Sequence, residues 1–439
     1  MINLNKKIKI ICAVVLATTS LSILYQNTRA NSSLTDGNFK SKVYLSKIVS
    51  NENPENNEVF VVNNKEVKSL GKDIYPNMIE YYDSLKGYLA ISPNSNELNL
   101  IYNNGNTRFI ADNIIDFKVI QNTIYYLNSK SELYKYNLKN KETDFIAQKV
   151  LNINSQDDIF YYLTEDNKLK FMIYGREFLS VDTKLSGSFE ENVKINRQEN
   201  KIIYPKEDGI YLYYINRKKN NEVKLSDNPR LYTAEFLKDA SIVFSTYSDN
   251  NPENIDIYRK IGDTEPKLLK TIPFDFKTLY SISDDSKGMV FEDKNLYYLN
   301  FKDEKITEIH TEGEIVDYHL YKDKIAFVSN GELLRLSLND PSDKEIIAKD
   351  ITPFNTEVIN QELVYLNTNK ELYYKNELIA KDVLEFITHK DYIIYKTTSN
   401  KIYMTSSNLK TSKLLEINGQ SLNSVNVDDK AISILQNDK

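Results

Sequence analysis

The feature that most constrains this chain is a group of short apolar segments that recurs in the same order along the sequence. The stretch 124–150 contains IYYLN, ELYKY and FIAQKV, and the stretch 363–383 contains LVYLN, ELYYK and LIAKDV. Residues 325–351 repeat this order with IAFVS, ELLRL and IIAKDI. Short runs of β-branched and aromatic residues between Asn, Asp, Lys, Ser and Gly are typical of strands joined by tight turns. The sequence therefore predicts one small β-sheet unit that is repeated many times.

A small residue in the third segment marks the register of the unit, although the middle units are degenerate. The marks fall at Gly71, Ala111, Ala147, Ser180, Ser226, Lys270, His310, Ala348, Ala380 and Glu416. Their mean interval is about 38 residues, and periods near 40 with four short strands are typical of β-propeller blades. Ten marks exceed the usual number of about four to eight blades. Three interpretations stay open: one large ring, two smaller propellers in tandem, or a miscounted degenerate unit.

The pattern divides the chain into three regions. Sustained helical periodicity does not occur beyond residue 30, so the predicted fold class is an all-β propeller. Residues 58–439 form the predicted repeat region, and the polar residues 31–57, rich in Asn, Ser and Glu, are predicted to be a linker. The first unit is short at its start, and the final apolar segment, 431–435, resembles the opening strand of a unit. We expect this segment to complete the first blade and to close the ring.

Residues 1–30 have the organisation of a secretory signal peptide. Basic residues at 6–9 precede an apolar run over 10–24, and Thr28 and Ala30 occupy the −3 and −1 positions of a cleavage site. Because Arg29 is unusual there, an uncleaved N-terminal membrane anchor is the alternative. The only cysteine, Cys12, lies inside the run, so a cleaved chain has no thiol for disulfides, nucleophilic catalysis or metal binding. The predicted location is extracellular or at the cell surface.

The charge balance weighs against nucleic-acid binding. Without the four cations of residues 1–30, the rest of the chain has a formal charge of −10, which opposes contact with phosphates. The basic run 217–219 is expected to be a solvated turn. Gly accounts for only 12 of 439 residues, so glycine-rich phosphate loops are not expected. Asp and Asn are expected to supply the left-handed turn positions instead.

The Tyr-rich segment 158–169, which reads DIFYYLTEDNKL, resembles the blades of secreted bacterial β-propellers of the TolB-like and YWTD-like kind. The likeness extends over roughly residues 58–435 and rests on strand-level motifs. It departs from YWTD blades because the chain has no Trp, and the Asp-Gly turn of TolB-like blades occurs only near 208–209. The resemblance implies a propeller fold and a tendency to bind other molecules, and it transfers no catalytic residue.

The sequence assigns no catalytic, cofactor-binding or metal-ligating residue. His310, His319 and His389 form no H-E-x-x-H pair, and turn or strand-edge positions are expected for them. The segment 249–256 is rich in the oxygen ligands that calcium prefers but lacks the EF-hand spacing. A solvated hairpin turn is therefore predicted there. The serine in 185–189 lies outside a G-x-S-x-G motif.

The expected function is binding. Tyr-rich segments such as 211–214 and 297–298 are expected to pack between blades, with stacking on sugars or peptides as the alternative. We expect an exported, non-catalytic propeller that binds an extracellular protein, peptide or glycan through loops on one ring face. The expected partners include no nucleic acid and no cofactor, and a membrane only through an uncleaved N-terminal segment. The alternative is a propeller-fold glycosidase or lyase that uses acids and tyrosines lining the central channel.

Overall fold

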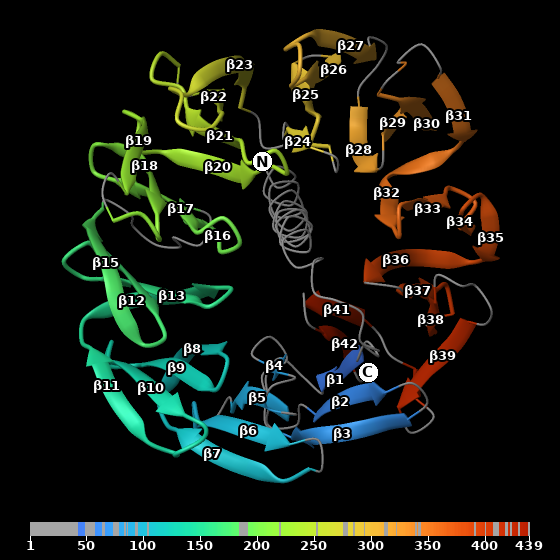
Figure 1. Cartoon of the computed structure of the whole chain (residues 1–439). Helices are drawn as coiled ribbons and strands as arrows, with labels where there is room; N and C mark the ends of the chain where they lie inside the picture. Colours follow the sequence, from blue (N-terminus) through green and yellow to red (C-terminus); the bar gives the residue numbers. More distant parts are fainter. Residues whose placement is uncertain are drawn as a thin grey trace, which may run out of the picture. The chain divides into compact units, whose positions relative to one another are not determined.

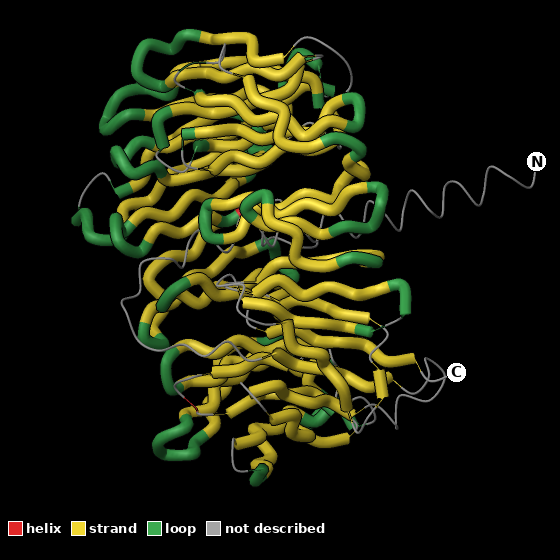
Figure 2. Tube along the Cα trace, turned by 90° about the vertical axis from the view of Figure 1, so that its right-hand side faces the viewer, coloured by secondary structure: helices red, strands yellow, loops and turns green. Residues whose placement is uncertain are grey.

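The computed structural model describes the chain between Val43 and Asn437 with gaps, of which the longest are 49–57, 73–78, 184–191, 275–279 and 407–411. Side chains are described between Tyr82 and Thr405, again with gaps. The elements assigned in this part of the chain are all β-strands, which make up most of the tube in Figure 2. The prediction of an all-β fold is therefore confirmed.

No described residue belongs to a helix that is long and apolar enough to cross a bilayer. The predicted signal peptide or anchor, residues 1–30, lies outside the described part of the chain.

The chain divides into two compact units, and the larger one extends from Asn113 to Phe386. In its described residues it contains seven consecutive four-stranded sheets, in which the strands pair in chain order as antiparallel meanders (Figure 1). The strands are β8 (Ile114–Ile120), β9 (Thr123–Asn128), β10 (Leu133–Asn137), β11 (Thr143–Ala147), β12 (Val150–Gln156), β13 (Ile159–Thr164), β14 (Lys168–Ile173), β15 (Arg176–Asp182), β16 (Lys194–Asn196), β17 (Lys201–Lys206), β18 (Gly209–Tyr214), β19 (Glu222–Ser226), β20 (Leu231–Phe236), β21 (Ile242–Tyr247), β22 (Asn254–Lys260), β23 (Lys267–Pro273), β24 (Ser281–Ile282), β25 (Gly288–Asp293), β26 (Asn295–Asn300), β27 (Ile306–His310), β28 (Ile315–Tyr321), β29 (Lys324–Ser329), β30 (Glu332–Ser337), β31 (Lys344–Ala348), β32 (Ile351–Ile359), β33 (Glu362–Asn367), β34 (Leu372–Tyr374) and β35 (Glu377–Ala380). Consecutive four-stranded meanders of this kind are propeller-like blades.

The smaller unit contains the described strands before Asp112 and those from Ile387 onward. The boundary falls inside β36, the first strand of the last sheet in chain order. The strands are β1 (Val43–Ile48), β2 (Glu58–Asn63), β3 (Glu66–Lys72), β4 (Ile79–Tyr82), β5 (Gly87–Ile91), β6 (Leu98–Tyr102), β7 (Thr107–Ala111), β36 (Val383–His389), β37 (Tyr392–Thr397), β38 (Ile402–Ser406), β39 (Ser412–Ile417), β40 (Gln420–Ser421), β41 (Ser424–Asp428) and β42 (Ala431–Asn437). They form one four-stranded and two five-stranded sheets.

The two ends of the described chain meet in one sheet, in the order β3-β2-β1-β42-β41. Strand β42 pairs with β1 in parallel, with Val43 opposite Ile432 and Ser46 opposite Leu435. The prediction that the last segment joins the first unit is confirmed, whereas the closure of a ring stays a prediction. The prediction of a linker over 31–57 is wrong for Val43–Ile48, because this short run, VYLSKI, contains Val, Tyr, Leu and Ile and pairs with β2, although it lies inside a stretch whose average composition is polar.

The register marks correspond to sheets one for one, since the described chain forms ten sheets. The interpretation of a miscounted unit is therefore wrong. The marks lie in the fourth strand of each four-stranded sheet, and not in the third strand as the segment order suggested. In the sheet formed by β8 to β11, Leu133 faces Ala147 whereas Tyr134 faces Phe145, so the mark follows a β-bulge.

The core of the larger unit lies between neighbouring sheets. In β13, Ile159, Tyr161 and Leu163 pack against β16 and β17, whereas Phe160 and Tyr162 pack against β9 and β12. Successive side chains point to opposite faces of a sheet, so these two sets of contacts bury both faces of the strand. Equivalent clusters fill each of the six junctions between consecutive sheets of the unit, as far as its residues are described. These clusters contain Tyr together with Ile and Leu, which is consistent with the prediction that Tyr-rich segments pack between blades.

The two ends of each sheet carry different connections. The turn edge carries the turns between the first and second strands and between the third and fourth strands. The linker edge carries the turns between the second and third strands and the connections to the next sheet. At the turn edge, the amide that follows the third strand donates to a carbonyl of the other turn in four sheets: Leu138 to Asn122 at 2.9 Å, Ile215 to Asn200 at 2.9 Å, Phe301 to Lys287 at 2.7 Å and Leu338 to Asp323 at 2.8 Å. These hydrogen bonds fix the two turns of a sheet relative to each other.

Many turns of this glycine-poor chain have left-handed residues other than glycine. Among the described residues, 22 non-glycine residues have a positive φ, compared with five glycines. Ten of the 22 are Asn or Asp, which confirms the expectation from composition. Lysines such as Lys141 and Lys370 also occupy such positions, which composition did not predict.

Candidate functional site

The first strands β28 and β32 of two neighbouring sheets share a polar cluster that consists of Asp317, His319 and Thr356. His319 Nε2 lies 2.9 Å from Thr356 Oγ1 and 3.3 Å from Asp317 Oδ2. The Thr356 hydroxyl donates to the same carboxylate oxygen. Asp317 and His319 are two positions apart on β28, so both side chains lie on one face of the strand. Each is 17% exposed.

The charges of this Asp317 cluster support each other. Burial opposes ionisation of Asp317, but the neighbouring His319 and the hydrogen bonds from His319 and Thr356 hold the pKa of the carboxyl below its usual value. Burial likewise opposes protonation of His319, and the Asp317 carboxylate overcomes it and raises the pKa of the imidazole. The cluster is thus an ion pair bridged by a hydroxyl.

The same cluster lacks the geometry of a catalytic triad. In a triad, the two nitrogens of the histidine hold the hydroxyl and the carboxylate separately. Here a single nitrogen, Nε2, faces both partners. The hydroxyl proton of Thr356 is directed to Asp317, so the imidazole does not receive it. The arrangement joins two sheets and does not activate a nucleophile.

Strand β32 contains an enlarged bulge next to this cluster. Ile351 and Thr356 are successive paired residues although they lie five positions apart, while their partners on β33 lie two positions apart. In β8 the corresponding shift involves only one extra residue, Ile115. The enlarged bulge places Phe354 at a φ of 59° with 58% of its surface exposed. Bulges of this kind redirect side chains and are frequent near functional sites.

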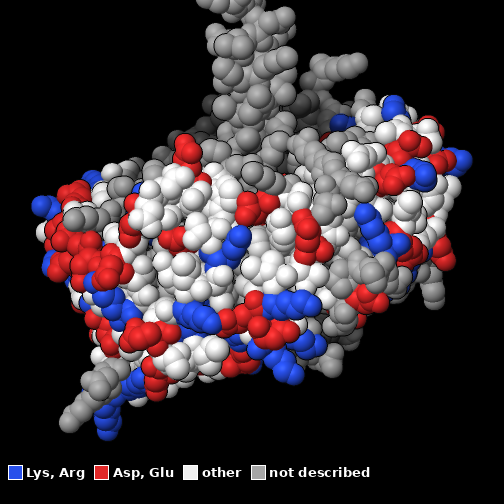
Figure 3. All heavy atoms as spheres, turned by 90° about the horizontal axis from the view of Figure 1, so that it is seen from above, with Lys and Arg blue, Asp and Glu red and all other residues white. Residues whose placement is uncertain are grey.

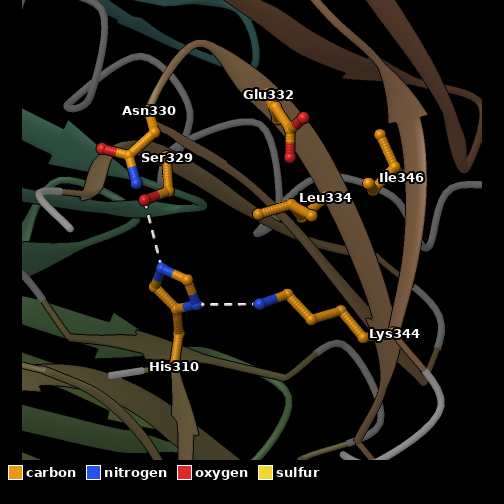
Figure 4. A pocket seen from close by; sticks show the side chains of 7 residues that line it. All are labelled: His310, Ser329, Asn330, Glu332, Leu334, Lys344 and Ile346. Carbon is orange, nitrogen blue, oxygen red and sulfur yellow. Dashed lines mark hydrogen bonds between the residues drawn. The ribbon is translucent and has the colours of Figure 1, made fainter. Parts of the chain in front are cut away.

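The second histidine, His310, ends β27 and lines a shallow pocket of about 250 Å³ (Figure 4). Lys344 Nζ lies 3.0 Å from His310 Nδ1, and Ser329 Oγ lies 3.1 Å from His310 Nε2. An ammonium group has only donors, so Nδ1 accepts from Lys344 and the ring hydrogen is on Nε2, which donates to Ser329. An imidazole in this tautomer cannot take the Ser329 proton through Nε2. Its ring packs on Phe327 at a centroid distance of 4.9 Å.

The other candidate groups from the sequence do not converge. His389 ends β36, and its side chain lies outside the described part, as does the segment 185–189. In the segment 249–256, Asp249 accepts from Asn228 at 2.9 Å and Asp256 accepts from Thr271 at 2.6 Å. Among the described residues, no three His, Cys, Asp or Glu side chains are grouped to hold a metal ion.

A further junction lies at the turn edge, where three turns from two sheets meet in a group that we call the Arg197 cluster: Asp158, Tyr174, Arg197 and Asn200. Arg197 Nε donates to Asp158 Oδ1 at 2.6 Å, and the guanidinium also donates to Asn200 Oδ1. The hydrogen bond to Asp158 raises the pKa of Arg197, and the nearby Tyr174 hydroxyl contributes to the same shift. Tyr174 itself is 70% exposed.

The two sheets are also joined by an amide beside this cluster. The Gln156 side chain donates to the Ile195 carbonyl at 2.9 Å and accepts from the Ile195 amide at 3.1 Å. This pair of bonds imitates the pairing of two strands across the junction between β12 and β16. The separation of 39 residues is close to the mean repeat and recurs between Asp158 and Arg197 and between Asp317 and Thr356.

Most of the predicted tyrosine and basic segments have local partners. Tyr298 and Tyr214 belong to buried clusters between sheets, as predicted. Arg217 stacks on the Tyr214 ring at 3.6 Å and pairs with Asp263 at 3.3 Å, so this part of the predicted basic turn is held by the protein itself. Tyr174 and Phe354 were not singled out from the sequence. The available signal for Tyr174 was a Tyr-Gly pair between two apolar runs, where Asn-Gly is the usual turn.

The charged side chains form no wide basic area on the side of the molecule drawn in Figure 3, where acidic and basic groups are interspersed.

Comparisons with known proteins assign no family. No family model matches the chain, and no curated protein matches it. The chain is similar to the crystal structure of a eukaryotic initiation factor, with 9% identity over 72% of this chain and 93% of that one and a TM-score of 0.47. It is also similar to the computationally designed Ika8 protein, with 9% identity, 76% and 97% coverage and a TM-score of 0.36. A third structure, KlHsv2 with loop 6CD replaced by a Gly-Ser linker, has 11% identity, 74% and 97% coverage and a TM-score of 0.33. At these scores, the likenesses assign neither fold nor function.

Proposed function

We propose that this protein is an exported or cell-surface binding protein of the secreted bacterial propeller kind. In this proposal it has no catalytic activity of its own and recognises an extracellular protein, peptide or glycan through the turns at one edge of its sheets. The signal-like segment 1–30 supports export, and the repeated sheets supply the scaffold.

The observation that carries the proposal is the fixed row of turns at the turn edge. Hydrogen bonds of 2.7–2.9 Å tie the paired turns together in four sheets of the larger unit. Side chains such as Arg197 and Arg217 then link turns of neighbouring sheets. Loops that are held before binding lose little conformational entropy when a partner docks.

The described histidine clusters are consistent with a binding role. The Ser329 hydroxyl accepts from His310, and the Thr356 hydroxyl donates to Asp317. In both clusters the polar groups are directed at one another across junctions between sheets.

The test combines a binding and a turnover measurement on the purified full chain. The immobilised chain is incubated with a surface extract and with an array of defined glycans, and it is assayed separately against a panel of glycosides and polysaccharides. We expect specific retention of one macromolecule and no turnover. Turnover that is abolished by replacing one acidic residue would favour the glycosidase or lyase alternative and overturn the proposal, as would the absence of any specific retention.

A further inference from the structure

We propose that Tyr174 is the anchor of a protein-binding patch on the turn edge, which it forms together with Arg217 and Ile261. This inference rests on the proposed binding function and names the surface and the class of partner. The three residues come from the turns between the third and fourth strands of three consecutive sheets, β12–β15, β16–β19 and β20–β23.

The backbone at Tyr174 is the first indication. Tyr174 and Gly175 form a two-residue turn between the paired residues Ile173 and Arg176, with φ values of 51° and 75°. A turn with two left-handed residues favours Asn or Asp at the first position, and a bulky side chain there is strained. The two-residue turn at 330–331 indeed has Asn first, with φ values of 51° and 76°. The chain therefore keeps an aromatic ring at the tip of this turn although the backbone conformation there is strained for it.

Packing of the Tyr174 ring against the protein does not offset this strain. Tyr174 is 70% exposed, whereas Tyr161 and Tyr162 on the neighbouring strand β13 are each 2% exposed. An exposed aromatic residue held in a strained conformation indicates a role outside the fold.

The surroundings hold the tip in place before any partner arrives. On one side Tyr174 lies near Arg197 of the next sheet, because its hydroxyl contributes to the raised pKa of that guanidinium. On the other side Gly175 is close to the preceding sheet, since a Cβ atom at this position would lie 3.7 Å from Lys135 Nζ. Preorganised aromatic side chains lose little entropy on binding, and Tyr and Arg are enriched among the residues that dominate protein interfaces.

The extent of the patch favours a protein over a single sugar. Ile261, which is 52% exposed, lies two sheets away from Tyr174, and neighbouring sheets pack about 10 Å apart. The patch therefore extends over roughly 20 Å, which suits a protein interface of about 800 Å² per partner. Arg217 lies between the two, stacked on Tyr214.

The test compares Tyr174→Asn with a matched control, Lys375→Asn. Lys375 occupies the first position of the equivalent turn between β34 and β35, with a φ of 53°. Both variants place Asn at a left-handed position, and both are expected to raise the melting temperature by about 2 °C. The full chain and the two variants, each at limiting amount, are incubated with the same surface extract, and the retained proteins are quantified. We expect Tyr174→Asn to retain its partner at least tenfold less, and Lys375→Asn to retain it like the unmodified chain.

The outcomes separate this inference from the proposed function. If Tyr174→Asn lowers the melting temperature, the ring is a structural anchor and the inference is wrong. Equal retention of the protein by Tyr174→Asn and the unmodified chain also overturns it, while the proposed function stands. Retention of a glycan alone overturns the protein class of the partner. If the unmodified chain retains nothing, the proposed function itself fails.

Discussion

Two junctions between neighbouring sheets of the larger unit are held together by different kinds of interaction. Between β12 and β16, the neutral Gln156 amide bonds to both backbone groups of Ile195. Between β28 and β32, the ion pair of Asp317 and His319 is bridged by Thr356. Both connect residues 39 positions apart. The comparison indicates that the repeat sets the positions at which neighbouring sheets are joined. The side chains at those positions determine whether the stability of the junction depends on pH.

The largest effect is expected at the charged junction. Asp317→Ala leaves His319 and Thr356 without their shared acceptor in a site that is only 17% exposed. We expect the free energy of unfolding to fall by about 3 kcal/mol, as measured by denaturant titration. A loss below about 1 kcal/mol would show that the ion pair contributes little beyond its own desolvation.

The neutral junction should be weaker. Gln156→Ala removes two hydrogen bonds and leaves the Ile195 amide and carbonyl without this partner. We expect a loss of about 2 kcal/mol. This loss should be the same at pH 5 and pH 8, because no ionisable group takes part. A pH-dependent loss would contradict the comparison.

The bridging hydroxyl can be separated from the charges. Thr356→Val keeps the shape of a side chain that is 4% exposed but removes the group that contacts both Asp317 and His319. The expected loss is about 1–2 kcal/mol in denaturant titration. Thr356→Ser keeps the hydroxyl and serves as the control, and an equal loss in both variants would assign the effect to packing of the methyl group.

The smallest effect concerns pH. The raised pKa of His319 gives a stabilisation that is complete below its ordinary value of 6.5 and is lost as the pH rises through the pKa in the folded protein. The lowered pKa of Asp317 gives a second stabilisation, which is present above pH 3.8 and is lost as the pH falls through the pKa of Asp317 in the folded protein. The junction is therefore strongest between these limits.

His319→Gln should remove the part that is lost at higher pH. The difference in unfolding free energy between the unmodified chain and this variant should shrink as the pH rises above 6.5. A difference that stays constant from pH 5 to pH 9 would contradict the assignment.

The repeated architecture could be predicted because each sheet repeats the same local pattern. Alternating Tyr, Ile and Leu in segments such as 159–163 indicate strands buried on both faces, and the small residues at the marks reveal the register. The strand Val43–Ile48 was missed because the polar residues around it outweigh this short run in the average composition, and only one of its two partners, β2, is close to it in the sequence.

The candidate sites could be predicted only in part. The histidines were visible in the sequence, but the partners of His319 include Thr356 on another sheet, 37 residues away. The enlarged bulge around Phe354 depends on the pairing of β32 with β33, and composition does not encode such a shift. Tyr174 becomes informative only when its positive φ and its exposure are known together.

The pairing of β42 with β1 has a consequence for biosynthesis. Strand β1 emerges from the ribosome among the first residues of the described chain, and its neighbour β42 among the last. During synthesis, the edge of β1 that β42 will cover exposes unpaired amides and carbonyls, which can pair with other chains. A chain that stops before β42 therefore keeps an open strand edge that can aggregate, and only a chain that includes β42 covers it.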